Sequence, residues 1–157
     1  MANVLEAFGT NGQTFTCTLA SLTDGSARQS TIVDNTSNLY SDVLVVIKVK
    51  TGASGASAAG NVQIFGIGTV DNGTTQTDLA GASDAAITVN SAPPIGSIPA
   101  TANATTYVGG PFSLAKAFGG TVPAKFGIII KNKTGTTLDS TEGNHAKLWQ
   151  GVYATVA

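Results

Sequence analysis

The chain has 157 residues, the length of a single domain. Only 11% of its residues are charged, against roughly 25% in an ordinary soluble domain, and the formal net charge is -1. This balance argues against a nucleic-acid partner and against a polybasic membrane-surface protein, because both need clustered Lys and Arg. Hydrophobic residues make up 42% of the chain, so a folded core is expected. The composition leaves one question: what keeps so uncharged a surface soluble, or covers it.

The N-terminus and the single cysteine narrow the setting. The first residues have neither the basic start nor the apolar run of a signal peptide, so synthesis in a cytoplasm without export is expected. The longest strongly apolar run, 43–47, is far shorter than the ~20 residues that span a bilayer, so no membrane partner is expected. Cys17 permits no internal disulfide and alternates with threonines, which predicts a small buried residue on a strand.

The pattern along the chain is that of β-strands. The strongest segment is 40–50, in which Val43, Val45, Ile47 and Val49 share one face, and the other face is also apolar at its start. This pattern predicts a strand that is buried on one face throughout and on both faces at its start. Helical signals are confined to a short stretch near 113–118. Taken in chain order, the predicted strands cover residues 14–19, 40–50, 61–71, 85–89, 104–108, 126–133 and 144–155.

These strands predict an all-β, single-domain antiparallel two-sheet sandwich, jelly-roll-like, with at most one short helix near 113–118. A parallel α/β fold is excluded because the crossover helices are missing. Residues 1–12 are expected to form an N-terminal arm, and residues 13–157 the sandwich domain.

The search for catalytic chemistry finds one polar cluster, Asp139, Glu142 and His145. A zinc site needs three or four ligands at defined spacing, so the cluster is interpreted as a polar loop entering the last strand. Neither Cys17 nor any Ser lies in a recognisable nucleophile motif. We therefore expect no catalytic residue, no cofactor and no metal site.

Two aromatic residues, Trp149 and Tyr153, share one face of the last predicted strand. Together with Tyr107 they are the candidates for a sugar-stacking platform, as on a carbohydrate-binding module. Packing in the core or at an interface is the alternative interpretation of the same pattern.

A resemblance to a known group of proteins rests on four segments. The segments are SARQSTIVDNTSNLYSDVLV (residues 26–45), YVGGPFSLAKAFGG (107–120), PAKFGIIIKN (123–132) and LDSTEGNHAKLWQGV (138–152). Together they resemble structural proteins of tailed bacteriophages, in particular the small β-sandwich decoration, or cement, proteins of phage heads.

The resemblance implies a non-enzymatic protein that is made in the host cytoplasm and lies on the outer surface of the capsid in the virion. Its expected partners are the major capsid protein and further copies of itself, as a dimer or trimer. The alternatives are a carbohydrate-binding module of a phage fibre or tail, with Tyr107, Trp149 and Tyr153 as its platform, and another structural component of the tail or neck. The candidate contacts lie in the arm and in the small-residue loop 51–60, and they are Val4, Leu5, Phe8, Ala53, Ser54, Ala56 and Ser57.

Overall fold

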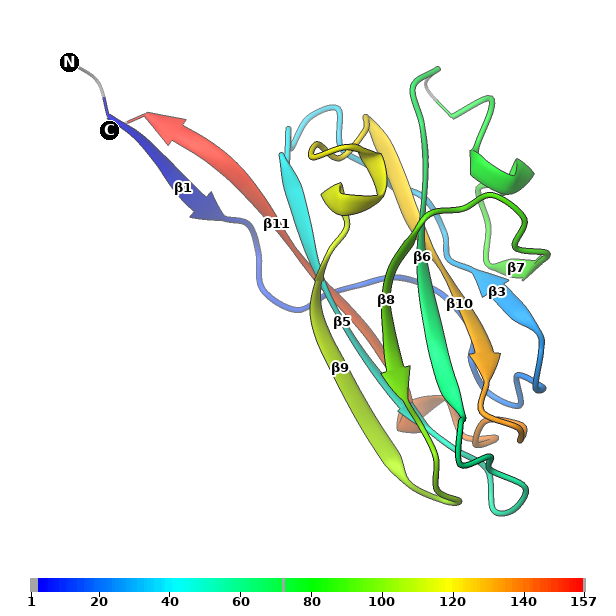
Figure 1. Cartoon of the computed structure of the whole chain (residues 1–157). Coiled ribbons are helices and arrows are strands. Elements are labelled where there is room, and N and C mark those ends of the chain that lie inside the picture. Colours follow the sequence, from blue (N-terminus) through cyan, green and yellow to red (C-terminus); the bar gives the residue numbers. More distant parts are fainter. Residues whose placement is uncertain (1–2, 72, 157) are drawn as a thin grey trace.

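In the computed structural model, which describes residues 3–71 and 73–156, two antiparallel β-sheets pack face to face (Figure 1). Sheet A contains β1 (Val4–Phe8), β2 (Gln13–Thr14), β5 (Asp42–Lys50), β9 (Thr106–Ser113) and β11 (Ala146–Val156). Sheet B contains β3 (Ala27–Gln29), β4 (Val33–Asp34), β6 (Asn61–Thr69), β7 (Ala85–Ile87), β8 (Pro94–Pro99) and β10 (Lys125–Lys133). Three short 3-10 turns complete the described elements: η1 (Thr77–Leu79), η2 (Ala115–Phe118) and η3 (Glu142–Asn144).

The strand order is that of a jelly roll. Strand β2 pairs with β11, β3 with β10, β5 with β9 and β6 with β8, as in one long hairpin rolled into two sheets. The pairs β11–β5 and β10–β6 join these hairpin layers within sheets A and B. The predicted all-β two-sheet fold is confirmed, and η2 occupies the position of the predicted short helix.

The main core lies between the two sheets, on the faces that the alternating pattern of β5 predicted. Val43, Val45, Ile47 and Val49 are all fully buried. An aromatic cluster closes one side of the core: the ring centroid of Phe126 lies 6.2 Å from that of Phe15 and 5.8 Å from that of Trp149. Edge-on contacts of this kind stabilise beyond the area that they bury.

The predicted strand at 14–19 forms only in part. Its side chains alternate as expected, with Phe15, Cys17 and Leu19 buried, but ladder pairing is limited to the two residues of β2. From there the chain crosses between the sheets: Phe15 N donates to Lys147 O of sheet A, and Thr31 N donates to Thr16 O. The alternation of apolar and polar side chains therefore predicts which residues are buried, but it does not predict which backbone groups pair in a ladder.

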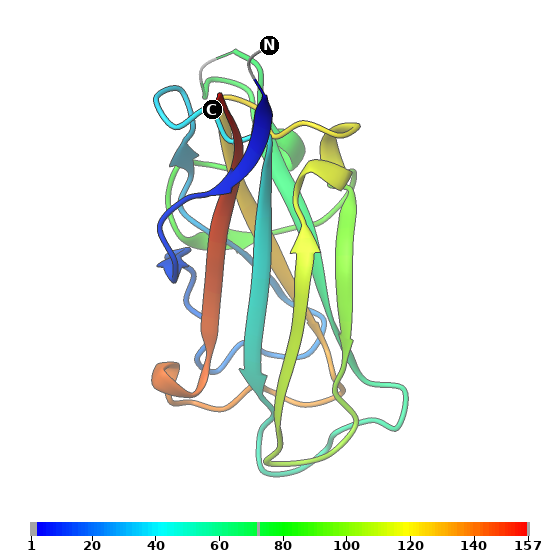
Figure 2. The same ribbon diagram turned by 90° about the vertical axis from the view of Figure 1, so that its left-hand side faces the viewer.

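The outer faces of the two sheets differ in what covers them. The long connection from β6 to β8 folds over sheet B, so that Ala80 and Ala92 bury Ile67 and Ile129 in a second apolar cluster. Figure 2 looks onto sheet A, where β11, β5 and β9 face the viewer with no comparable layer in front of them.

Both ends of the chain join in a two-stranded ribbon that projects from the sandwich (Figure 1). Strand β1 pairs with the end of β11 from Val4 opposite Val156 to Phe8 opposite Val152. On its other side, the ladder between β11 and β5 stops at Val152, which lies opposite Asp42, the first residue of β5. We call residues 4–8 and 152–156 the terminal ribbon.

Tyr40 packs over the point where this ribbon leaves the sandwich. Its ring lies against two glycines: a Cβ added at Gly9 would fall 2.8 Å from the hydroxyl oxygen, and one added at Gly151 would fall 2.3–2.4 Å from three ring atoms. The same ring contacts Trp149 and Tyr153, with centroids 6.1 and 6.2 Å apart.

Replacing Gly151 by alanine is therefore expected to destabilise the fold by about 1–3 kcal/mol, because the Tyr40 ring must leave its aromatic neighbours. The melting temperature should fall by about 3–10 °C, measured by circular dichroism. Gly143→Ala is the matched control, since nothing lies within 4 Å of an added Cβ there, and it should leave the melting temperature within about 2 °C of the wild type. Equal melting temperatures for the two variants would contradict the packing role of Gly151.

Candidate binding surface

The polar cluster of Asp139, Glu142 and His145 holds loops together. Glu142 accepts hydrogen bonds from the N–H groups of Leu19 and Ala20, at 2.8 and 2.7 Å, and from Lys147. His145 is buried; its Nδ1 accepts from the backbone N–H of Lys50 at 3.3 Å, and its Nε2 lies 3.0 Å from the carbonyl oxygen of Asp139. These contacts occupy the polar groups that a catalytic or metal site would need free.

The negative charge of Asp139 in this cluster is also stabilised by contacts within the protein. Hydrogen bonds from Asn144 and Thr141, with the nearby Lys50 ammonium, hold the pKa of the Asp139 carboxyl well below its usual range. Within residues 3–71 and 73–156, no group of three or more His, Cys, Asp or Glu side chains is arranged to hold a metal ion.

The single thiol is unsuited to nucleophilic chemistry. Burial raises the pKa of Cys17 to about 12, and the negative charge of Asp84 adds to this effect. The thiolate is the reactive form, so at neutral pH this cysteine behaves as the small buried residue that the sequence predicted.

The three aromatic residues proposed as a glycan platform do not present one exposed face. Trp149 is only 7% exposed and lies in the core against Phe15 and Phe126. The ring of Tyr153 packs against that of Tyr40 at an interplanar angle of 51°, and the hydroxyl of Tyr107 accepts from the N–H groups of Thr101 and Ala102. The alternative, packing within the protein, describes these side chains.

The loop 51–60 lies at the opposite end of the sandwich from the terminal ribbon (Figure 1). Ala53, Ser54 and Ser57 are exposed there, and Ala56 is half-buried. The backbone of this loop is not free, since Ala56 N donates to Asn103 Oδ1, Ser57 N donates to Thr134 O and Ser54 O accepts from Thr136. A contact made by the ribbon end of the molecule would leave this loop uncovered, so the two sets of predicted contacts do not form one surface.

The terminal ribbon gathers exposed apolar side chains. Val4 is 72%, Leu5 50% and Phe8 58% exposed on β1, and Val156 is 69% exposed on the paired end of β11. Glu6 is the one ionisable residue of β1. The predicted arm is therefore one strand of a paired ribbon, and its three predicted contact residues are all accessible.

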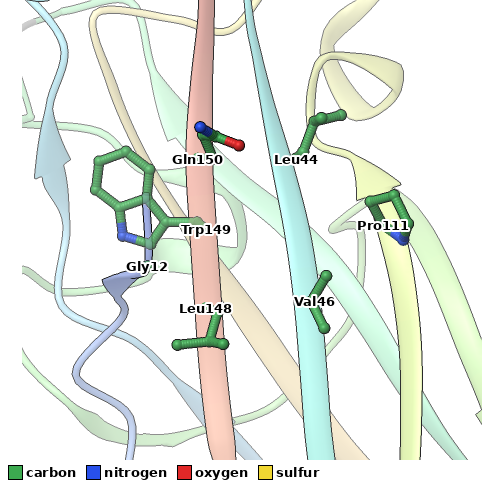
Figure 3. Close-up of a pocket in the computed structure, with 7 residues that line it drawn as sticks. All are labelled: Gly12, Leu44, Val46, Pro111, Leu148, Trp149 and Gln150. Carbon is green, nitrogen blue, oxygen red and sulfur yellow. The ribbon is translucent and has the colours of Figure 1, made fainter. Parts of the chain in front are cut away.

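The outer face of sheet A is a second apolar surface, which the sequence interpretation missed. Leu44 and Val46 of β5 are half-buried, Leu148 of β11 is 38% exposed and Val108 of β9 is 64% exposed. Leu44, Val46 and Leu148 line a shallow groove together with Pro111 of β9 (Figure 3). The signal was present in β5, whose two faces are both apolar between residues 43 and 47, but it was interpreted as burial on both sides.

No protein-family model and no curated protein sequence matches the chain. No helix of the described residues is long and apolar enough to cross a membrane.

Proposed function

We propose that the protein is a phage capsid decoration protein, which binds the outer surface of the assembled head and stabilises it through non-catalytic contacts. The observation that carries the proposal is the terminal ribbon, an exposed apolar element held clear of the sandwich. The proposed location on a phage head is supported by the resemblance of residues 26–45, 107–120, 123–132 and 138–152 to head decoration proteins.

The ribbon has the properties of an element that is covered in its working state. An isolated two-stranded ribbon is marginally stable in water, and apolar side chains gathered on a surface mark interaction sites. Its low charge also reduces the cost of removing water from it.

Backbone groups add a second means of binding. Residues 153–156 of β11 pair with β1 on one side only, so their other edge is open to a further strand. Addition of a strand to such an edge supplies main-chain hydrogen bonds, and the neighbouring pockets select side chains.

A protein that binds only the assembled lattice stabilises it by mass action, without any reactive group. The major capsid protein is thus the expected partner, and no cofactor or nucleic acid takes part. This mechanism agrees with a chain whose polar clusters are occupied by internal hydrogen bonds.

The test is to mix purified protein with expanded heads that lack it. We expect saturable binding, with hundreds of copies per particle, and a higher disruption temperature of the heads. Absence of binding would overturn the proposal. A copy number of a dozen or fewer in intact virions would move the protein to the tail or neck.

A further inference from the structure

The outer face of sheet A is an apolar surface that is separate from the terminal ribbon. Along β5 it presents Asp42, Leu44, Val46 and Lys48 in turn, because these residues alternate with the buried ones. The ladder pairs Val46 with Leu148, and Leu44 with Gln150, so the apolar centre extends onto β11. The connection between β6 and β8 covers the outer face of sheet B, whereas no such layer covers sheet A within residues 3–71 and 73–156.

We infer that this face is the interface between two copies of the chain, packed sheet A against sheet A about a two-fold axis. An interface of this kind uses the same patch on both copies, so the patch must be complementary to itself. The proposal goes beyond the binding of heads and does not rest on it.

The charges on β5 fit this requirement. Asp42 lies at one end of the apolar stretch, where its Oδ1 accepts hydrogen bonds from the N–H groups of Val43 and Ala115 and its negative charge is retained. Lys48 lies at the other end, and within the described residues it has no ion-pair partner. A two-fold axis perpendicular to the strands and passing between Leu44 and Val46 places Asp42 of one copy opposite Lys48 of the other. The same axis stacks Leu44 on Val46 of the second copy.

The alternative two-fold, parallel to the strands, would place Asp42 opposite Asp42 and Lys48 opposite Lys48. Like charges held opposite each other disfavour that arrangement, so the charge pattern selects the antiparallel one. Glu6 adds a negative charge at the Asp42 end, and Lys116, which lines the same hollow, offsets part of it. At the other end Lys50 is already paired with Asp139 at 3.1 Å.

The face is large enough for an interface at the lower end of the standard size. Its three strands, β11, β5 and β9, cover roughly 430 Å² of flat sheet over about nine residues each, at a strand spacing of about 4.8 Å and a rise of about 3.3 Å per residue. Side-chain relief raises the accessible area toward the roughly 600 Å² per partner of the smaller standard interfaces. Face-to-face sheets pack with their strands aligned within about 30°, which keeps Asp42 and Lys48 of the two copies near each other.

Light scattering coupled to gel filtration measures the mass of the protein in solution and so distinguishes one copy from two. We expect the purified wild-type chain to elute with twice the 15.7 kDa mass of one copy. Val46→Lys adds a charge at the centre of the face, and Lys48→Glu places like charges opposite each other. Each variant is expected to weaken dimerisation at least about 100-fold and to shift the mass to that of one copy.

Val70→Lys is the matched control, because Val70 is 96% exposed and follows β6 in sheet B. This variant should remain a dimer, and all variants should keep the circular dichroism spectrum and melting profile of a folded sandwich. A wild-type chain with the mass of one copy or of three would overturn the inference. So would a dimer that survives both Val46→Lys and Lys48→Glu. Neither outcome depends on whether heads are bound.

Discussion

Replacing Val4, Leu5 and Phe8 together by threonine is expected to weaken binding to heads by about 1000-fold. These three side chains are 50–72% exposed in the free protein, so burying them against a capsid contributes binding free energy without loss of internal packing. Threonine retains the preference for a strand but removes much of the apolar surface. A loss of about 4 kcal/mol over three side chains corresponds to that change in Kd.

Binding is measured by co-sedimentation of labelled protein with heads that lack it, over a range of protein concentrations. The matched control replaces exposed apolar residues outside the ribbon, Val70→Thr with Leu39→Asn, because these side chains are 96% and 73% exposed. The control should bind as the wild type does. Equal affinities for the ribbon variant and the control would remove the ribbon from the mechanism.

Deletion of residues 1–12 is the coarser form of the same experiment. It should also weaken binding to heads while the sandwich stays folded, but it removes more than side chains. The hydrogen bond from Gly9 N to Gly151 O is lost, and residues 153–156 lose their only paired strand. The threonine variant is therefore the sharper test, since it keeps the ribbon's backbone pairing.

The fold could be predicted from the sequence because burial in a sandwich follows strand alternation. The segments at 40–50, 61–71, 126–133 and 144–155 correspond to β5, β6, β10 and β11, the four strands that form the centre of the two sheets. Strand β8 was missed, since its sequence Pro-Ile-Gly-Ser-Ile-Pro carries residues that disfavour strands. It is found at the edge of sheet B, where proline is tolerated.

The pairing of the two ends could not be predicted in the same way. The paired residues Val4 and Val156 are separated by nearly the whole chain, and neither segment contains a turn signal that would indicate its partner. The sequence therefore predicted the apolar contacts of the arm but not its second strand. The outer face of sheet A was missed for a related reason, because an apolar residue on a strand looks the same whether a second layer or a second molecule covers it.

Lys147 is a buried charged residue whose position follows from the alternation of side chains along β11. The pattern of β11 places it on the same face as Trp149, which points into the sandwich, and its side chain is 8% exposed. A buried ammonium needs an anion, and Glu142 supplies it from η3 while also accepting from the N–H groups of Leu19 and Ala20. One carboxylate thus ties the last strand to the crossing segment.

Replacing Glu142 by alanine is expected to destabilise the fold by about 3 kcal/mol. The variant leaves the Lys147 charge and two backbone N–H groups without their acceptor, and breaking a buried pair from one side costs more than the pair contributes. The value is placed at the lower end of the range because the Glu142 side chain is 41% exposed. Urea unfolding at pH 7 measures the change, and the double variant with Lys147→Met should recover part of it.

A control ion pair on the surface separates this effect from a general loss of charge. Lys125 lies 3.9 Å from Asp34, whose side chain is 58% exposed, so Lys125→Met should change stability by less than about 1 kcal/mol. An equally small effect of Glu142→Ala would contradict the bridging role of this carboxylate.

The pH dependence gives an independent readout of the same group. Burial opposes ionisation of Glu142, but the hydrogen bonds from Lys147, Ala20 and Leu19 outweigh it and hold the pKa of the carboxyl below its usual range. A carboxyl with a lowered folded pKa stabilises the fold above its unfolded pKa of about 4.3, and this contribution disappears as the pH falls through the folded value. The stability difference between the wild type and Glu142→Gln should therefore be constant from about pH 7 to 5 and shrink below about pH 4. A difference that grew on acidification would require a raised pKa and would contradict the hydrogen-bonded carboxylate.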